Sequence, residues 1–125
     1  MSTGEDRDQD RAAERLIDDA EQRRFELYRG EALAGWLYYS RLRPNRFALR
    51  HAEVDPSHRR RGVAGAMVAR VLEQIRARSG TVTAICPFVA DFLSKNSAYD
   101  DLVDPRFPGY PDRASAEAAQ ADARD

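Results

Sequence analysis

The sequence predicts a single-domain α/β (α+β) fold with a mixed, mostly antiparallel sheet and one parallel strand–helix–strand unit. Three observations predict this fold. Short segments before residue 55 alternate apolar and polar residues, a period typical of half-buried strands. A stretch with apolar residues three and four positions apart follows, which indicates an amphipathic helix. A β-branched segment comes next, and a strand reached through a helix runs parallel to the strand before that helix.

Three strands are expected before the helix. Residues 25–28 alternate apolar and polar side chains, and Gly30 suits the turn that follows because glycine tolerates positive φ. Residues 33–42 are rich in large apolar side chains and form the hairpin partner. Pro44 presets φ for the next turn, after which residues 47–54 return as the third strand.

Two ionisable residues stand near the end of the third strand. Strict alternation places His51 and Glu53 on the same face as Phe47 and Leu49. An apolar face that ends in two ionisable side chains, at the C-terminal end of a strand, is unusual.

The helix is expected after Pro56 and ends before Gly80, since glycine commonly follows a helix. Its apolar face consists of Ala64, Met67, Val68, Val71, Leu72 and Ile75. Residues 81–86 form a buried strand and residues 89–95 a short helix. The expected order is therefore β-β-β-α-β-α.

The two ends of the chain differ in composition from its middle. Residues 1–20 are dense in charge and are expected to form a tail or a frayed helix, whereas residues 104–125 form a second charged tail, rich in proline and then alanine, that is weakly helical or disordered. The domain proper is assigned to residues 21–103.

Composition excludes several functional classes. The net charge of −1 gives no global field toward nucleic acid or membrane. The longest apolar run is too short to span a bilayer, and the acidic N-terminus does not resemble a secretory signal. Cys86 is the single cysteine and cannot form an internal disulfide, so a reducing, cytoplasmic setting is expected.

The segment between the third strand and the helix has the features of an anion site. Gly62 and Gly65 leave room for a ligand to approach the backbone. The helix start supplies unpaired amides and the positive end of a dipole, and Arg59, Arg60 and Arg61 add positive charge. The alternative interpretation is a helix start with a solvated basic cluster.

Arg59-x-x-Gly62-x-Ala64 resembles the signature of the GCN5-related N-acetyltransferases (GNAT superfamily). With residues 51–54 and 86–89 it resembles the minimal, single-domain branch of that superfamily, often labelled YjdJ-like, over about residues 24–103. The resemblance implies acetyl-CoA as cosubstrate and no metal. It places the pyrophosphate of coenzyme A on the backbone amides of Arg60, Arg61, Gly62, Val63, Ala64 and Gly65. It also implies that the Val54 backbone bonds the pantetheine or the acetyl carbonyl and that Arg59 and Arg60 reach phosphate.

The implied reaction is direct attack of a primary amine on the acetyl thioester, which needs a base, a polarised carbonyl and a proton for the thiolate. His51 and Glu53 are the candidate bases, and a structural role for either is the alternative. Tyr99 is a candidate proton donor to the thiolate, or else a ring packed at the edge of the core. Cys86 offers a covalent acyl-cysteine route, or else acts as a small hydrophobe.

The acceptor is expected to be a small amine or the amine of a peptide or protein, and the chain a monomer or weak dimer. The alternative function is a non-catalytic binding module for coenzyme A or acyl-CoA. A nucleic-acid binder that uses residues 58–61 is disfavoured, because no second basic stretch supports it.

Overall fold

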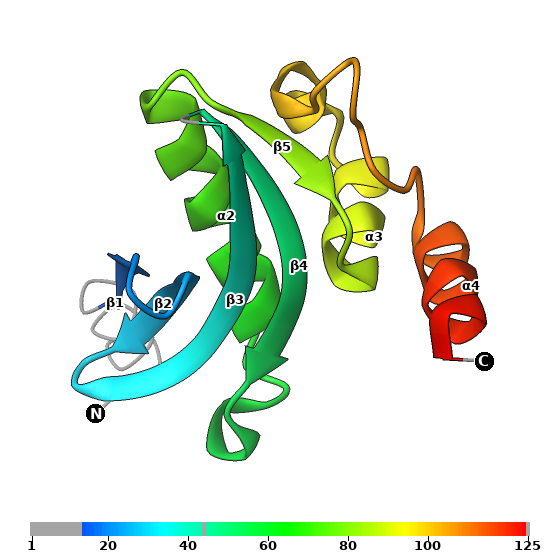
Figure 1. Cartoon of the computed structure of the whole chain (residues 1–125). Coiled ribbons are helices and arrows are strands. Elements are labelled where there is room, and N and C mark those ends of the chain that lie inside the picture. The colour runs from blue at the N-terminus through cyan, green and yellow to red at the C-terminus, as the bar shows by residue number, and fades with distance from the viewer. Residues whose placement is uncertain (1–13, 44, 125) are drawn as a thin grey trace.

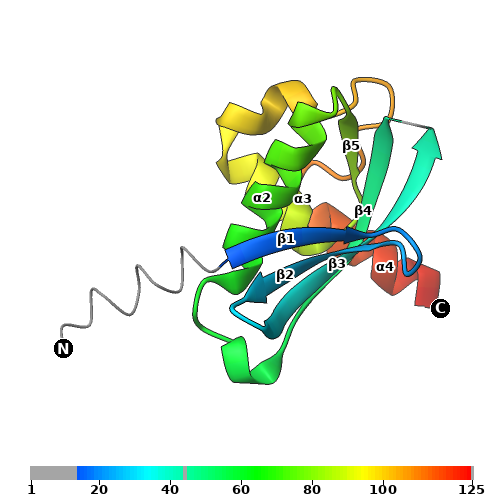
Figure 2. The same ribbon diagram turned by 90° about the vertical axis from the view of Figure 1, so that its left-hand side faces the viewer.

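The computed structural model describes residues 14–43 and 45–124 as a curved sheet with one long helix packed across one face (Figures 1 and 2). The strands are β1 (Glu14–Asp19), β2 (Arg24–Arg29), β3 (Ala32–Arg43), β4 (Arg46–Val54) and β5 (Thr81–Ala84). The helices are α2 (Val63–Ala77), α3 (Pro87–Lys95) and α4 (Arg113–Arg124), with short 3-10 turns η1 (Pro56–His58) and η2 (Ser97–Leu102). None of the helices in the described ranges is long and apolar enough to cross a membrane.

The sheet follows chain order, β1-β2-β3-β4-β5. The first four strands pair antiparallel, whereas β4 and β5 pair parallel through the crossover helix α2. The predicted mixed sheet with a parallel strand–helix–strand unit is therefore confirmed.

The core lies between α2 and the sheet. The fully buried side chains of α2 are Met67, Val68, Val71, Leu72 and Ile75. The sheet contributes Phe25, Leu27, Leu37, Phe47, Leu49 and Val82. Each such side chain contributes on the order of 1.5–3 kcal/mol through burial of its apolar surface. The predicted apolar face of the helix is correct except at Ala64, which is only partly buried.

The frayed helix expected before residue 21 is wrong where the structure describes it, because residues 14–19 form strand β1. This strand pairs along the outer edge of β2. Leu16 packs against the core while the neighbouring Ile17 is exposed, the alternation of a strand. Pairing with β2 outweighs the weak helical tendency of this segment, since tertiary contacts override weak propensity. Residues 1–13 lie outside the described residues.

The C-terminal segment covers the free edge of β5 and then forms a helix. The Ala84 amide donates to the Pro108 carbonyl at 3.0 Å, and the Tyr110 amide donates to the Ala84 carbonyl at 2.8 Å. Helix α4 packs against α3 and buries Ala116 completely. Of the two alternatives for this segment, the helical one holds over Arg113–Arg124.

Strand β4 contains a β-bulge that the sequence pattern did not predict. Tyr38 lies opposite His51, but the next residue, Tyr39, lies opposite Leu49, so Arg50 is the extra residue. An extra residue reverses the alternation of side chains beyond it.

The bulge changes the face on which the candidate bases lie. Beyond it, Ala52 and Val54 pack against the core, whereas His51 and Glu53 are exposed. The expectation that these two residues share a face with Phe47 is therefore wrong. They lie on the sheet face opposite α2.

Candidate functional site

The two parallel strands separate in the middle of the molecule. Pairing between β4 and β5 extends only from Arg46 to Leu49 on the β4 side. The amides of Ile85 and Cys86 both donate to the Leu49 carbonyl, at 3.0 and 2.9 Å. The chain then enters α3 at Pro87, while β4 continues alone on this side. A gap therefore opens between the end of β4 and the start of α3.

The end of β4 presents backbone groups to this gap. The Asp55 amide donates to the Ala34 carbonyl at 2.9 Å, and Val54 lies opposite Gly35. In an antiparallel ladder, hydrogen-bonded and non-hydrogen-bonded pairs alternate. The N–H and C=O of Val54, and likewise those of Ala52, therefore face away from β3 toward the gap.

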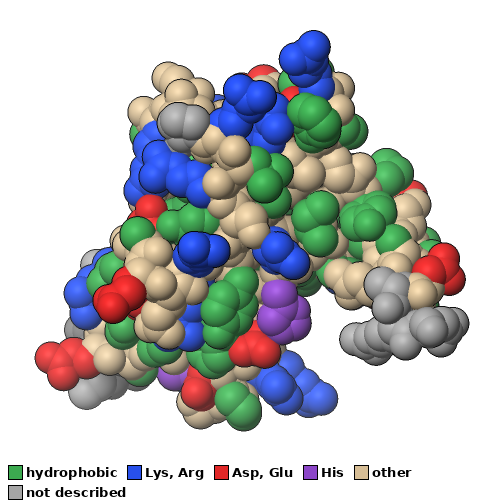
Figure 3. All heavy atoms as spheres, in the orientation of Figure 1, with side chains coloured by type: hydrophobic (Ala, Val, Ile, Leu, Met, Phe, Trp, Pro, Cys, Tyr) green, Lys and Arg blue, Asp and Glu red, His purple; other side chains and the backbone are tan. Residues whose placement is uncertain are grey.

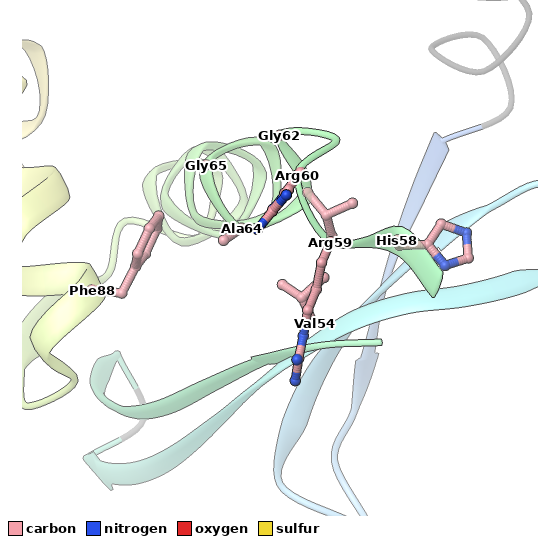
Figure 4. Close-up of a pocket in the computed structure, with 9 residues that line it drawn as sticks. Val54, His58, Arg59, Arg60, Gly62, Ala64, Gly65 and Phe88 are labelled. Carbon is pink, nitrogen blue, oxygen red and sulfur yellow. The ribbon is translucent and has the colours of Figure 1, made fainter. Parts of the chain in front are cut away.

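A cavity of about 260 Å³ lies at this gap (Figure 4). Its lining consists of Val54, His58, Arg59, Arg60, Gly62, Val63, Ala64, Gly65 and Phe88. The structure thus brings together every residue predicted to contact the cofactor except Arg61. Sequence reasoning missed Phe88 and His58 as lining residues, although Phe88 belongs to the segment that carried the resemblance.

The turn before α2 leaves the helix start open. Gly62 is the N-cap of α2 with φ of +71°, and no side chain caps the helix. A Cβ added at Gly62 or Gly65 would meet no atom within 4 Å. The amides of the first helical turn have no partner within the helix, and the helix dipole makes this end positive. The geometry suits an anion.

Two arginines increase the positive charge at this end. Arg59 and Arg60 are exposed, line the cavity, and have no ion pair with any described residue. Figure 4 shows their side chains between the end of β4 and the first turn of α2, with Phe88 across the opening. Positive side chains at a helix N-terminus oppose the dipole, so this arrangement favours a bound anion rather than the empty helix.

Asp55 fixes the chain between β4 and the turn. Its carboxylate accepts hydrogen bonds from the hydroxyl and the amide of Ser57, the latter at 2.9 Å. These bonds lower the pKa of Asp55. The carboxylate also lies 3.7 Å from Nδ1 of His58, which holds that ring at the edge of the cavity.

The candidate bases form a pair on the open face of the sheet. Nε2 of His51 lies 3.0 Å from Oε1 of Glu53, and the His51 ring is nearly parallel to that of Tyr38, with centroids 6.4 Å apart. The side chains of His51 and Glu53 are 59% and 46% exposed. Figure 3 shows this face, on which a histidine adjoins an acidic side chain. Solvent and an incoming molecule both have access to the pair.

Of the other two predicted catalytic residues, Cys86 lies next to the gap and Tyr99 lies far from it. Cys86 is 3% exposed and is the N-cap of α3. Tyr99 packs against Phe92 and under the guanidinium of Arg76, near the C-terminal end of α2. Arg76 is twelve residues beyond Ala64, about 18 Å along a helix. The structure therefore does not bring Tyr99 to the cavity.

No group of three or more His, Cys, Asp or Glu side chains within the described ranges is arranged to hold a metal ion.

The fold and the cavity define a small α+β domain with an anion site at the point where two parallel strands separate. A family model described as GCN5-related N-acetyl-transferase matches residues 24–102, well over half of the chain. The chain therefore belongs to the GCN5-related N-acetyltransferase family and carries an acetyltransferase-type domain. No curated protein matches the sequence. The narrower likeness to the YjdJ-like branch is consistent with this result and stays a prediction.

Proposed function

We propose that this protein transfers an acetyl group from acetyl-CoA to a primary amine by direct attack of the amine on the thioester. The observation that carries the proposal is the cavity at the separated strands. Free helix amides and the unpaired Arg59 and Arg60 stand at one end of it. The unpaired edge of β4 runs along the same gap. A phosphate group and an extended amide chain are the two chemistries that these features recognise.

The turn and the strand edge would hold different parts of the cosubstrate. The amides of Val63, Ala64 and Gly65 are suited to the pyrophosphate, with the two arginines as charge-assisted donors. The outward-facing groups of Ala52 and Val54 are suited to the amides of pantetheine, as an added strand would be. The Val54 amide would polarise the acetyl carbonyl.

His51 is the base that the geometry favours. The Glu53 carboxylate only accepts hydrogen bonds, so the 3.0 Å contact favours the tautomer with the proton on Nε2 of His51. Nδ1 then keeps a free lone pair. The amine loses its proton to this ring as its nitrogen attacks the acetyl carbon. The C–S bond breaks, and the thiolate takes up a proton from solvent and leaves as coenzyme A. The exposed His51 ring returns the proton of the amine to solvent.

The acceptor would approach from the open face that carries His51. We infer a small amine or an exposed amine of a peptide or protein, since that face is uncovered at this pair. The single, buried Cys86 also supports the cytoplasm as the compartment.

A pair of glutamate substitutions on one helix tests the proposal. Gly65→Glu places a carboxylate at the helix start, where it complements the dipole and improves helix propensity but repels phosphate. We expect unchanged or higher thermal stability together with at least roughly 100-fold weaker acetyl-CoA binding by calorimetry, equivalent to about 2.7 kcal/mol. Ala77→Glu adds the same charge to the exposed far end of α2 and should leave the affinity unchanged.

Two results with the wild-type protein would overturn the proposal. Wild-type protein that binds no acetyl-CoA at tens of micromolar ligand would remove the cofactor site altogether. Binding without acetyl transfer to any of a panel of primary amines would leave the non-catalytic binding module instead.

The covalent route through Cys86 has its own test. Intact protein incubated with acetyl-CoA in the absence of amine should gain no acetyl mass after denaturation, because the thiol is buried. An acetyl group recovered on Cys86 would replace direct transfer with an acyl-cysteine intermediate.

A further inference from the structure

A buried carboxylate in β1 joins two arginines from different elements. The side chain of Glu14 is only 7% exposed. Its Oε2 lies 2.9 Å from both Nε and Nη2 of Arg29 in β2, and its Oε1 lies 3.0 Å from Nε of Arg70 in α2. A carboxylate that accepts a bidentate guanidinium fixes the orientation of that guanidinium.

The third nitrogen of Arg29 extends this contact to the cofactor turn. Nη1 of Arg29 donates to the carbonyl of Arg61 at 3.1 Å. Because a trans peptide is planar, its C=O and N–H point in opposite directions. The bond to Arg29 therefore directs the Gly62 amide away from Arg29, and Gly62 lines the cavity.

The turn before α2 is unfavourable by itself and needs a stabilising contact from outside. Arg60 and Gly62 both have positive φ, +64° and +71°. For a non-glycine residue this conformation costs roughly 1–2 kcal/mol. Arg59, Arg60 and Arg61 are also consecutive like charges. Without an outside contact, the turn has neither a side-chain cap nor a relaxed backbone to hold its shape.

We propose that Glu14 is a positioning residue for the cofactor turn, which sets the affinity for acetyl-CoA through Arg29 without touching the ligand. The inference rests on the proposed function for its ligand. Glu14 lies outside residues 24–102, the part that matches the family model, so the turn is held by a strand that this match does not include.

The chain offers a matched control on the same strand. Asp18, near the other end of β1, pairs with Arg78 at 2.9 Å and accepts the hydroxyl of Tyr39 at 2.6 Å. Like Glu14, it joins β1 to the end of another element. Asp18→Asn therefore removes a similar contact without affecting the turn.

The experiment compares Glu14→Gln, Arg29→Lys and Asp18→Asn by calorimetry with acetyl-CoA and by hydrogen exchange of the turn. We expect Glu14→Gln to weaken acetyl-CoA binding roughly tenfold, the order seen when an outer partner that orients a ligand-binding group is lost. The amides around Gly62 should exchange faster in this variant. Asp18→Asn should lower the melting temperature and change neither quantity.

A double-mutant cycle tests the route through Arg29. Lysine at position 29 keeps the charge beside Glu14 but not the planar fork that also reaches Arg61. The double variant Glu14→Gln/Arg29→Lys should therefore bind acetyl-CoA about as weakly as either single variant, since both changes interrupt one path.

Three results would overturn the inference: wild-type affinity in Glu14→Gln, an equal loss in Asp18→Asn, or fully additive losses in the cycle. If wild-type protein itself binds no acetyl-CoA, the proposed function fails. Hydrogen exchange then still decides whether Glu14 holds the turn, because unchanged exchange around Gly62 in Glu14→Gln would contradict that role as well.

Discussion

The two ends of α2 both carry arginines, but only one end pairs them. At the C-terminal end, Arg76 pairs with Glu73 and Asp101 at 2.9 and 2.8 Å, and Arg78 pairs with Asp18 at 2.9 Å. At the N-terminal end, Arg59 and Arg60 have no ion pair with any residue in the described ranges.

This difference separates arginines that stabilise the fold from arginines for which we propose a role in binding. Cations near a helix C-terminus interact favourably with the dipole, and cations near the N-terminus do not. The C-terminal arginines of α2 are therefore explained by the fold alone. Those at the N-terminus oppose the dipole, so an anionic ligand is the simplest physical reason for their position.

Among changes that compare the two ends of α2, the largest expected effect comes from neutralising the unpaired arginines. The double substitution Arg59→Gln/Arg60→Gln should weaken acetyl-CoA binding roughly 10- to 100-fold, because two charge-assisted contacts are lost. Stability should stay unchanged or rise by about 0.3–1 kcal/mol, since an unfavourable charge–dipole interaction is removed. Calorimetry and chemical denaturation measure the two quantities.

The matched control is Arg76→Gln/Arg78→Gln at the paired end. These changes should lower stability and leave acetyl-CoA affinity unchanged. Equal losses of affinity in the two double variants would show that the two ends of α2 do not differ in function.

A smaller effect is expected from the glycine in the turn. Gly62→Val and Gly30→Val both place a side chain at positive φ in open space, at +71° and +63°. Each should cost roughly 1–2 kcal/mol in stability, measured by chemical denaturation. Only the Gly62 variant should also lose affinity for acetyl-CoA. Similar affinities for the two variants would argue against the turn as the binding site.

The smallest effect concerns how stability depends on pH, through Tyr39, which bonds Asp18 near the C-terminal end of α2. Burial, and then the hydrogen bond to Asp18, raise the pKa of Tyr39 to about 12. Its pKa in the unfolded chain is about 10. Between these values the folded protein keeps the proton that the unfolded chain has lost, so stability falls as pH rises from about 10 to about 12.

Tyr39→Phe should flatten this part of the pH dependence. Denaturation at about pH 9 and about pH 11 measures it, and the difference in stability between the two conditions should be smaller in the variant than in the wild type. An equal difference in both proteins would show that Tyr39 does not contribute.

Features that depend on neighbouring residues in the sequence were predictable. The apolar face of α2 repeats with the helical period, and Gly62 and Gly65 stand together at the helix start. These local patterns placed the cavity lining from Arg59 to Gly65, apart from Arg61, whose carbonyl is held by Arg29, far away in the sequence.

Features that depend on distant residues were not predictable. Strand β1 is defined by the edge of β2 and by the contact of Glu14 with Arg29 and Arg70, and its own six residues show only a weak helical pattern. The bulge at Arg50 leaves no local signal, yet it decides the face on which His51 lies. The location of Tyr99 likewise depends on packing against Phe92, not on its distance along the sequence.

We propose that the first turn of α2 holds the phosphates of coenzyme A. The most direct measurement is the amide NMR spectrum of the ¹⁵N-labelled protein, titrated with acetyl-CoA. We expect saturable shifts centred on the amides of Gly62, Val63, Ala64 and Gly65, with much smaller shifts at the C-terminal end of the helix near Arg76. Shifts absent from these amides, or centred on the C-terminal end, would contradict the claim.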